Sequence, residues 1–374
     1  MFNILKKLED KIFNLLQEIH FTNNFNRSEL RHNYKSFIDK PENLALITEN
    51  ICNGSFSGQY FNLNEEDKKF VGHLKESLLF MKRLKKEEQN NKSYYNKGAM
   101  WTRIESNFLN NVIDCDDRLF NHIGSLSYKS FKPVNYNFKN SLHDVYLTLI
   151  YYDFLKRENK NLSSIYTNLN SPYFTFDKLK LNTNIYYIGI FNIIEKIIND
   201  MQKENNKNIK ILEIGPGKGQ FANIIFNNIK NVKYVMVDIP PMHSIAPYFL
   251  YKHGKKICTY KHFCSLNKSL DEVFKNYDVL LLPPYEKEIL INYNFDLSIN
   301  CRSLCEMQFD EAKSYINLIN DTSKYFFSVN TNKKSQSVEY EKFGFLDLEK
   351  YLTKMNIVDA GFTFGDAAML KRPH

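Results

Sequence analysis

Cysteine is scarce in this chain, and no two cysteines stand at the spacing of a metal-ligand or redox pair. Six are spread over 374 residues, with no C-x-x-C pair and no histidine at zinc spacing: Cys52, Cys115, Cys258, Cys264, Cys301 and Cys305. A disulfide framework and a structural zinc site are therefore not expected. The pattern favours reduced thiols in a cytoplasmic protein.

Long apolar runs are also missing at the start of the chain. Charged residues interrupt the apolar positions of residues 1–21 at helical spacing. This pattern predicts an amphipathic helix, and it is typical neither of a signal peptide nor of a membrane span. Because such an apolar face often pairs two subunits, a homodimer through the N-terminal helices is one expectation.

Charge of one sign is not concentrated anywhere. The 50 basic and 42 acidic residues give a net charge of +8, and no block of five like charges occurs. Phosphate-bearing partners are permitted by this balance but not demanded, and a nucleic-acid partner is not expected. The acidic cluster Asp114, Asp116 and Asp117 has no His or Asn support, so the sequence predicts solvated carboxylates and no metal site.

The content that is present is that of a sizeable folded protein. Hydrophobic residues make up 43% and aromatic residues 15% of the sequence, which suits a chain long enough for two domains. Residues 1–160 show helical periodicity without repeated strands, including a helix that begins after an N-cap at Asn64. We expect three parts: a mostly helical region, 1–160, that shapes the substrate site or joins subunits; a strap and lead-in helix, 161–205; and a ligand-binding domain, 206–374.

The chain is organised around the stretch Ile211-Leu212-Glu213-Ile214-Gly215-Pro216-Gly217-Lys218-Gly219-Gln220. An apolar run enters a turn with glycine at every second position, and apolar residues then continue at helical spacing, which indicates strand, tight turn and helix. Glycine lets the backbone approach a ligand, and the following helix directs free N–H groups at it. A second apolar strand ends at Asp238, a carboxylate placed to hold the hydroxyls of a ribose. A glycine-rich turn without any ligand is the alternative.

The glycine spacing does not fit the dinucleotide fingerprint, since Gln220 stands where its third glycine should fall and Glu213 is foreign to it. Acid-x-Gly-x-Gly-x-Gly instead resembles motif I of the class I S-adenosylmethionine-dependent methyltransferases. That resemblance implies that Gly215, Gly217 and Gly219 pass under the amino-acid end of the cofactor and that Asp238 binds its ribose.

Strands and helices alternate from residue 206 onward. Strands are predicted at 211–214, 234–238, 256–260, 278–282, 296–300, 325–330 and 357–364, with helices between them. This order predicts an α/β, doubly wound, Rossmann-like sheet of seven strands. Residues 161–184 read as an aromatic loop, either packed at a domain seam or strapped over the active site.

A closer resemblance covers roughly residues 165–335. The strand ending Val237-Asp238-Ile239-Pro240, the segment Asn300 to Met307 and the Ser171-Pro172 loop resemble the bacterial sugar O-methyltransferase family. In that family an Asn-x-x-Ser-x-x-Glu-Met segment faces the substrate side of the cofactor, which implies that role for Asn300, Ser303, Glu306 and Met307. An acidic residue commonly follows the second-strand proline, whereas this chain has Pro241.

The resemblance implies S-adenosyl-L-methionine as cofactor, no metal, and a sugar or nucleotide-sugar acceptor in surface glycan synthesis. The cofactor-binding residues that we expect are Glu213, Gly215, Pro216, Gly217, Gly219, Asp238, Ile239, Pro283, Tyr285 and Asn300. Methyl transfer to a sugar hydroxyl needs an in-line acceptor and a base, for which Glu306, His243, His143 and His122 are candidates. Tyr173, Phe174, Tyr186 and Ser303 are the candidates for contact with the substrate.

Two other functions remain open. Leu282-Pro283-Pro284-Tyr285 resembles the Asp/Asn-Pro-Pro-Tyr motif of methyltransferases that act on adenine in nucleic acid, although leucine cannot accept a hydrogen bond from an amine. Tyr285 is therefore assigned to the adenine pocket of the cofactor. The second alternative is a non-catalytic protein that keeps the fold as a scaffold.

Overall fold

The computed structural model describes residues 63–87, 109–117, 120, 174–176, 179–181, 185–205, 208–331, 350–363 and 366–373. Several sequence predictions lie outside these residues: the first amphipathic helix, the Ser171-Pro172 loop, Tyr173, His122 and His143. No helix among the described segments combines the length and apolar content needed to cross a membrane.

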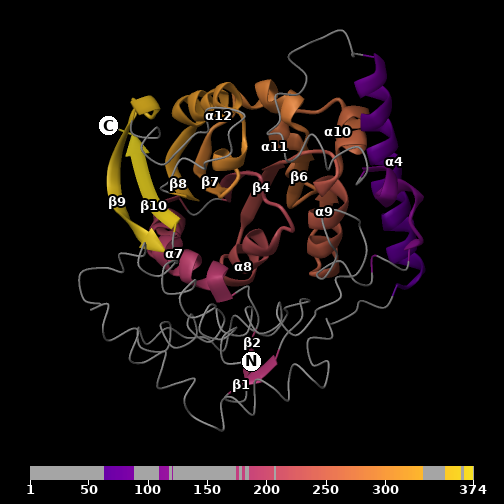
Figure 1. Cartoon of the computed structure of the whole chain (residues 1–374), viewed down its shortest axis with the longest axis horizontal. Helices are drawn as coiled ribbons and strands as arrows, with labels where there is room; N and C mark the ends of the chain where they lie inside the picture. The colour runs from indigo at the N-terminus through magenta and orange to yellow at the C-terminus, as the bar shows by residue number, and fades with distance from the viewer. Residues whose placement is uncertain are drawn as a thin grey trace, which may run out of the picture.

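One sheet forms the centre of the described structure (Figure 1), with the strand order β5-β6-β4-β3-β7-β8-β10-β9. From β5 to β8 every neighbouring pair is parallel, whereas β10 runs antiparallel to both β8 and β9. The strands are β3 Ile209–Ile214, β4 Val232–Val237, β5 Ile257–Cys258, β6 Val279–Leu282, β7 Phe295–Cys301, β8 Ser323–Thr331, β9 Met355–Thr363 and β10 Asp366–Pro373.

The predicted doubly wound α/β fold is confirmed, and the predicted number of strands is wrong. Six strands run parallel, and the antiparallel pair β9 and β10 brings the described sheet to eight. The missed strand is β10, which reads Asp-Ala-Ala-Met-Leu-Lys-Arg-Pro. Alanine, aspartate, lysine and proline have low strand propensity, so only its pairing between β8 and β9 makes this segment a strand.

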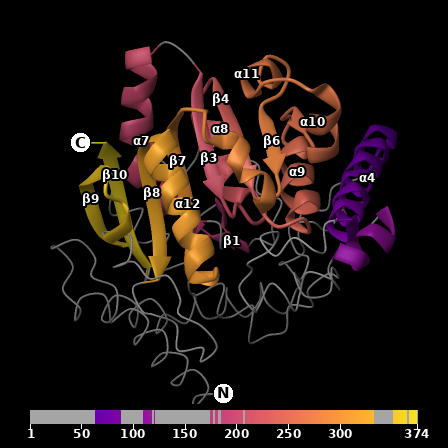
Figure 2. The ribbon, with the colours of Figure 1, turned by 90° about the horizontal axis from the view of Figure 1, so that it is seen from above.

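Helices cover both faces of the sheet. In Figure 1, α7 Ile185–Asn205, α8 Gln220–Asn228 and α9 Met242–Lys252 lie below the strands, and α10 Tyr260–Leu266, α11 Leu270–Val273 and α12 Phe309–Thr322 lie above them. Figure 2 looks onto the sheet, with α12 crossing in front of β7 and β8. All four residues of β6 are buried, as expected for a parallel strand with helices on both faces.

Helix α4, Glu65–Glu87, packs on α9 and α10 at the β5 side of the sheet. The predicted N-cap is confirmed, because Asp67 N–H donates to Asn64 Oδ1 at 2.8 Å and Asn64 N–H donates back to Asp67 Oδ2 at 2.9 Å. Phe70 stacks on Tyr251 with ring centroids 4.1 Å apart. Lys252 Nζ lies 2.8 Å from Asp67 Oδ2, an ion pair with little exposure. This part of the N-terminal region therefore shares its core with the sheet.

Residues 174–176 and 179–181, which the sequence predicted as loop, form a two-stranded antiparallel sheet of their own, β1 Phe174–Phe176 and β2 Leu179–Leu181. Three residues per strand are too few for a pattern of alternation to be visible in the sequence.

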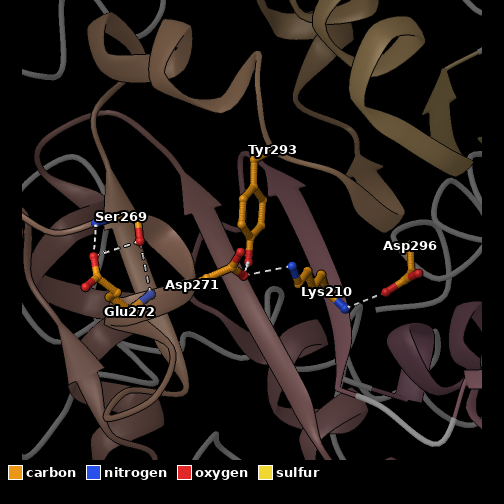
Figure 3. Close-up of polar contacts among 6 residues, drawn as sticks. All are labelled: Lys210, Ser269, Asp271, Glu272, Tyr293 and Asp296. Carbon is orange, nitrogen blue, oxygen red and sulfur yellow. Dashed lines mark hydrogen bonds and ion pairs between the residues drawn. The ribbon is translucent and has the colours of Figure 1, made fainter.

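A polar network fixes the amino ends of the strands (Figure 3). Lys210, near the start of β3, donates its backbone N–H to Asp296 Oδ2 at 3.0 Å, and its ammonium lies 2.8 Å from Asp271 Oδ1. Tyr293 also donates to Asp271 at 3.1 Å, and α11 begins with a reciprocal cap between Ser269 and Glu272. These contacts tie β3, β7 and α11 together at the amino ends of the strands.

Candidate functional site

The glycine-rich turn joins the carboxyl end of β3 to α8. Gly215, Gly217 and Gly219 all take positive φ, at 71°, 56° and 74°, a conformation that side-chain-bearing residues rarely adopt. Gly215 N–H donates to Val237 O at 2.8 Å, which extends the pairing of β3 with β4 into the turn. Gly219 then caps α8. The predicted strand, turn and helix are therefore present at this position.

Neighbouring residues leave no room for a side chain at Gly215 and little room at Gly219. A Cβ on Gly215 would stand 2.3 Å from both Cβ and Oγ of Ser303, and a Cβ on Gly219 would stand 3.2 Å from the Cβ of Ala246. The first approach brings the turn after β7 against the turn after β3. The second brings α9 against the start of α8.

Asp238 follows β4 and faces the glycine turn. Its Oδ2 accepts from Gly217 N–H at 3.0 Å, and its Oδ1 accepts from its neighbour Ile239 N–H at 2.7 Å. Burial raises the pKa of this carboxyl to about 7, although both hydrogen bonds act to lower it. Asp238 thus ties the carboxyl end of β4 to the turn and holds a carboxyl group in a fixed orientation there.

Glu213 lies beneath the turn. Its side chain is 2% exposed, and Tyr234 of β4 donates to its Oε2 at 2.8 Å. Burial raises the pKa of Glu213 to about 8. The side chain of Glu213 is thus enclosed between β3 and β4, and its predicted role in cofactor binding stays a prediction.

Asn300, the next-to-last residue of β7, is fully buried and belongs to a closed hydrogen-bond network. Its amide donates to Ile214 O at 2.8 Å and to Ser303 Oγ, while its Oδ1 accepts from Asn330 Nδ2 at 2.9 Å and Leu304 N–H at 3.3 Å. Every donor and acceptor of the amide is therefore used. Asn300 thus holds the turns after β3 and β7 together, and its predicted contact with the cofactor stays a prediction.

Ser303 and Glu306 occupy the segment after β7. Ser303 Oγ donates to Ile214 O at 2.8 Å, and the short 3-10 helix η4, Leu304–Glu306, follows. Glu306 is partly exposed, and its charge acts to raise the pKa of Asp238. Arg302, which sequence analysis did not single out, is exposed and holds φ at 68°, with its N–H donating to Val329 O at 2.7 Å. Met307 directly follows η4 and is partly buried against the core.

Pro283 and Tyr285 stand at the end of β6, directly beside Asp238, because β6 pairs with β4. The predicted strand at 256–260 exists only as the two-residue β5, which lies outside β6 at the edge of the sheet. Pro283 is extended and starts the 3-10 helix η3, Pro284–Leu290, in which Tyr285 meets Tyr260 edge-on at 5.9 Å. Tyr285 therefore lies just past the carboxyl end of β6, and its assignment to the adenine stays a prediction.

His243 lies in the first turn of α9 and is 2% exposed. Its Nε2 is 2.9 Å from Asp238 O, so the neutral ring donates to that carbonyl. Burial lowers the pKa of His243 to about 4, and its Nδ1 has no hydrogen-bond partner among the described residues. His243 thus supports the main chain of Asp238.

The remaining candidates are only partly described. Tyr186 lies in α7 and Phe174 in β1, and the side chains of both lie outside what the structure describes. Pro216 is buried within the glycine turn, and Ile239 is half-buried after Asp238. Asp117, from the acidic cluster, forms an ion pair with Lys75 at 2.7 Å. No group of three metal-ligating side chains is found within the described residues.

Sequence analysis missed the buried residues that hydrogen-bond to Glu213 and Asn300. Tyr234 and Asn330 are buried in strands, where they hydrogen-bond Glu213 and Asn300. A polar residue inside an apolar strand was the available signal, since buried polar groups need partners. Their partners are brought together only by the order of the strands in the sheet.

Comparison with known proteins yields partial matches. No family model matches the chain. The ribosomal RNA small subunit methyltransferase A of Mycoplasma mobile is 29% identical over 141 residues, or 37% of this chain and 53% of that protein. The chain thus matches about half the length of that curated relative.

Solved structures also overlap with part of the chain. An O-methyltransferase family protein from Burkholderia thailandensis is 7% identical with a TM-score of 0.34, covering 51% of this chain and 59% of that one. Magnesium protoporphyrin IX methyltransferase from Synechocystis PCC 6803, solved with bound SAM, is 12% identical with a TM-score of 0.33, covering 50% of this chain and 81% of that one.

Proposed function

We propose that this chain is an S-adenosylmethionine-dependent O-methyltransferase that modifies a sugar hydroxyl. The observation that carries the proposal is the contact between Gly217 N–H and the carboxylate of Asp238, across a turn whose three glycines all take positive φ. This contact holds the carboxylate that follows β4 of the parallel sheet beside the glycine turn and the N-terminus of α8. That donor set fits a nucleoside carrying an amino-acid tail.

In this proposal, different residues of the chain bind different parts of the cofactor. Asp238 receives the ribose hydroxyls, Tyr285 lies against the adenine, and the backbone of the glycine turn holds the amino-acid end. Bound S-adenosylmethionine supplies an electrophilic methyl group on a sulfonium. Glu213, Asn300 and His243 hold the turns that follow β3, β7 and β4 in position.

The acceptor side lies at the carboxyl end of β7. Ser303 and Glu306 follow Asn300 there, and Glu306 is a partly exposed carboxylate near Asp238. We assign Glu306 the role of taking the hydroxyl proton, since a weakly acidic sugar hydroxyl needs a base within hydrogen-bond reach. His243 is a weaker candidate, because its Nε2 is engaged by a main-chain carbonyl.

A second candidate is methylation of RNA. It is favoured by the similarity to the ribosomal RNA methyltransferase named above and by the Pro-Pro-Tyr segment after β6. Leu282 is fully buried there and has no acceptor for a base amine, which weighs against this alternative.

Methyl transfer from radiolabelled S-adenosylmethionine to a panel of acceptors tests the proposal. The panel contains nucleotide sugars, free sugars, and ribosomal small subunits that lack methylation. We expect label in a sugar fraction, and this label should remain bound under base treatment that cleaves esters. Label only in RNA would establish the second candidate, and cofactor binding without transfer to any acceptor would revive the scaffold.

The proposal places the enzyme in the cytoplasm, in the synthesis of a surface glycan, with residues 161–184 and the N-terminal helical region shaping the acceptor site. A homodimer through the N-terminal helices and the domain boundaries near residues 160 and 205 remain part of the same proposal.

A further inference from the structure

Two carboxyl groups share one face of the sheet beneath the glycine turn. In the register of β3 and β4, Glu213 stands opposite Met236, and Asp238 follows two positions later. Alternate residues of a strand point to the same side, so Glu213 and Asp238 are diagonal neighbours. Strand spacing and rise place their Cα atoms roughly 8 Å apart. Asp238 acts to raise the pKa of Glu213, and Glu306 acts to raise the pKa of Asp238.

Neither Glu213 nor Asp238 belongs to an ion pair within the residues that the structure describes. The hydrogen bonds to Glu213 and Asp238 come from a phenol and two backbone N–H groups. The titratable and charged groups around the pair are Tyr187 of α7, Tyr234 of β4, His243 of α9, Tyr315 of α12, Cys301 at the end of β7, and Arg302 and Glu306 after it. Burial is the largest influence on both carboxyls, and it favours their neutral forms.

We propose that Glu213 and Asp238 together hold a proton in the ligand-free site and release it when a cationic ligand binds beside them. This inference rests on the proposed function, in which the ligand is S-adenosylmethionine with its ammonium and sulfonium charges. The released proton passes to solvent, and the ionised pair balances the positive charge of the ligand.

The electrostatics supports release near neutral pH. Burial sets the pKa of Glu213 to about 8 and that of Asp238 to about 7, so the pair holds between one and two protons at pH 6.8. A positive charge within a few ångströms in a poorly solvated site lowers both pKa values. Binding therefore removes up to about one proton, and affinity rises by up to about tenfold per pH unit over this range.

Calorimetry in two buffers measures the released proton directly. S-adenosylmethionine is titrated into the protein at pH 6.8, once in PIPES and once in imidazole, which take up protons with different heats. At this pH the ligand's own amino group is charged, since its ordinary pKa is about 7.7 to 8.0. The difference in observed heat divided by the difference in buffer ionisation heat gives the number of protons, expected at about 0.5 to 1.

A matched ligand and two variants locate the proton. Methylthioadenosine retains the nucleoside but has neither charge, so it should bind without proton release. Glu213→Gln keeps the shape and an acceptor for Tyr234 but has no proton to give, so release should fall by at least half. Tyr234→Phe removes a hydrogen bond that favours the ionised form of Glu213, so its release should shift to higher pH.

The outcomes separate this inference from the function on which it rests. Binding with equal heats in both buffers would overturn the inference and leave the cofactor assignment intact. Proton release that is the same for methylthioadenosine would also overturn it, because ligand charge would then not be the cause. No binding of S-adenosylmethionine would instead contradict the proposed function. The wild-type measurement decides the matter even if Glu213→Gln does not fold.

Discussion

Gly215 and Ser303 come from turns 88 positions apart in the sequence, yet no Cβ fits between them. A Cβ on Gly215 would lie 2.3 Å from Ser303 Oγ, which itself donates to Ile214 O at 2.8 Å. Asn300 donates to the same carbonyl. The glycine turn after β3 and the turn after β7 are thus one interlocked unit, and a change in either one should alter the other.

Gly215→Ala should disrupt this unit. The substitution combines a positive φ with a clash against a short side chain tied by two hydrogen bonds, so we expect a loss of stability of about 3 kcal/mol or more and no cofactor binding. Gly254→Ala is the matched control, because Gly254 has φ of 76° but nothing within 4 Å of an added Cβ. It should cost about 1 kcal/mol in urea unfolding and leave binding intact. Equal losses in the two variants would show that contact with Ser303 is unimportant.

The buried acid should make stability depend on pH. The folded pKa of Glu213 is about 8 against an ordinary 4.5, so the folded state binds this proton more tightly than the unfolded state. That stabilisation is complete below about pH 4.5 and is lost as pH rises toward 8, with a slope of up to about 1.4 kcal/mol per unit.

Urea unfolding at pH 5.5, 6.5 and 7.5 measures this dependence. Wild type should lose stability relative to Glu213→Gln as pH rises, because Glu213 ionises in the unfolded state while it stays neutral in the folded state. The difference between the two proteins isolates Glu213 from other titrating groups. Parallel pH dependence in both would contradict the account of Glu213.

The packing of α4 against α9 should depend on Asp67. Asp67 has a side-chain exposure of 3%, pairs with Lys252 of α9, and caps its own helix through Asn64. Asp67→Ala should therefore reduce the free energy of unfolding by about 2 to 4 kcal/mol. Glu65→Ala, in the same turn, removes an exposed pair with Lys68 and should cost much less, because solvent screens that pair. Similar costs would mean that the α4 to α9 pair contributes little.

Kinetics should separate the two candidate bases. Glu306→Gln should lower kcat by about 10²-fold or more with cofactor affinity retained, since a base acts in the transition state. His243→Gln should instead weaken cofactor binding and leave the pH profile of kcat unchanged, because His243 acts through the main chain of Asp238. An unaltered kcat in Glu306→Gln would remove Glu306 from the mechanism.

The local parts of the site were predictable from the sequence, whereas the contacts between them were not. Glycine at alternate positions has few explanations other than a tight turn with positive φ, and an apolar strand ending in Asp238 needs only the period of two to be recognised. The partners Tyr234, Asn330 and Ser303 depend on strand order, which places β7 beside β3 and β8 beside β7. Burial of Asn300 and Glu213 follows from that order as well. Strand β10 was missed because pairing, not propensity, forms it.

Calorimetric titration of S-adenosylmethionine into wild type and Asp238→Ala tests the central claim most directly. Wild type should bind in the micromolar range, and loss of a charged hydrogen-bond partner should weaken binding by about 1 to 3 kcal/mol, or roughly 5- to 150-fold. Asp271→Ala, at the opposite end of the sheet, is the control and should bind as wild type does (Figure 3). Absence of binding to folded wild type, or equal affinity in Asp238→Ala, would contradict the assignment of this site to the cofactor.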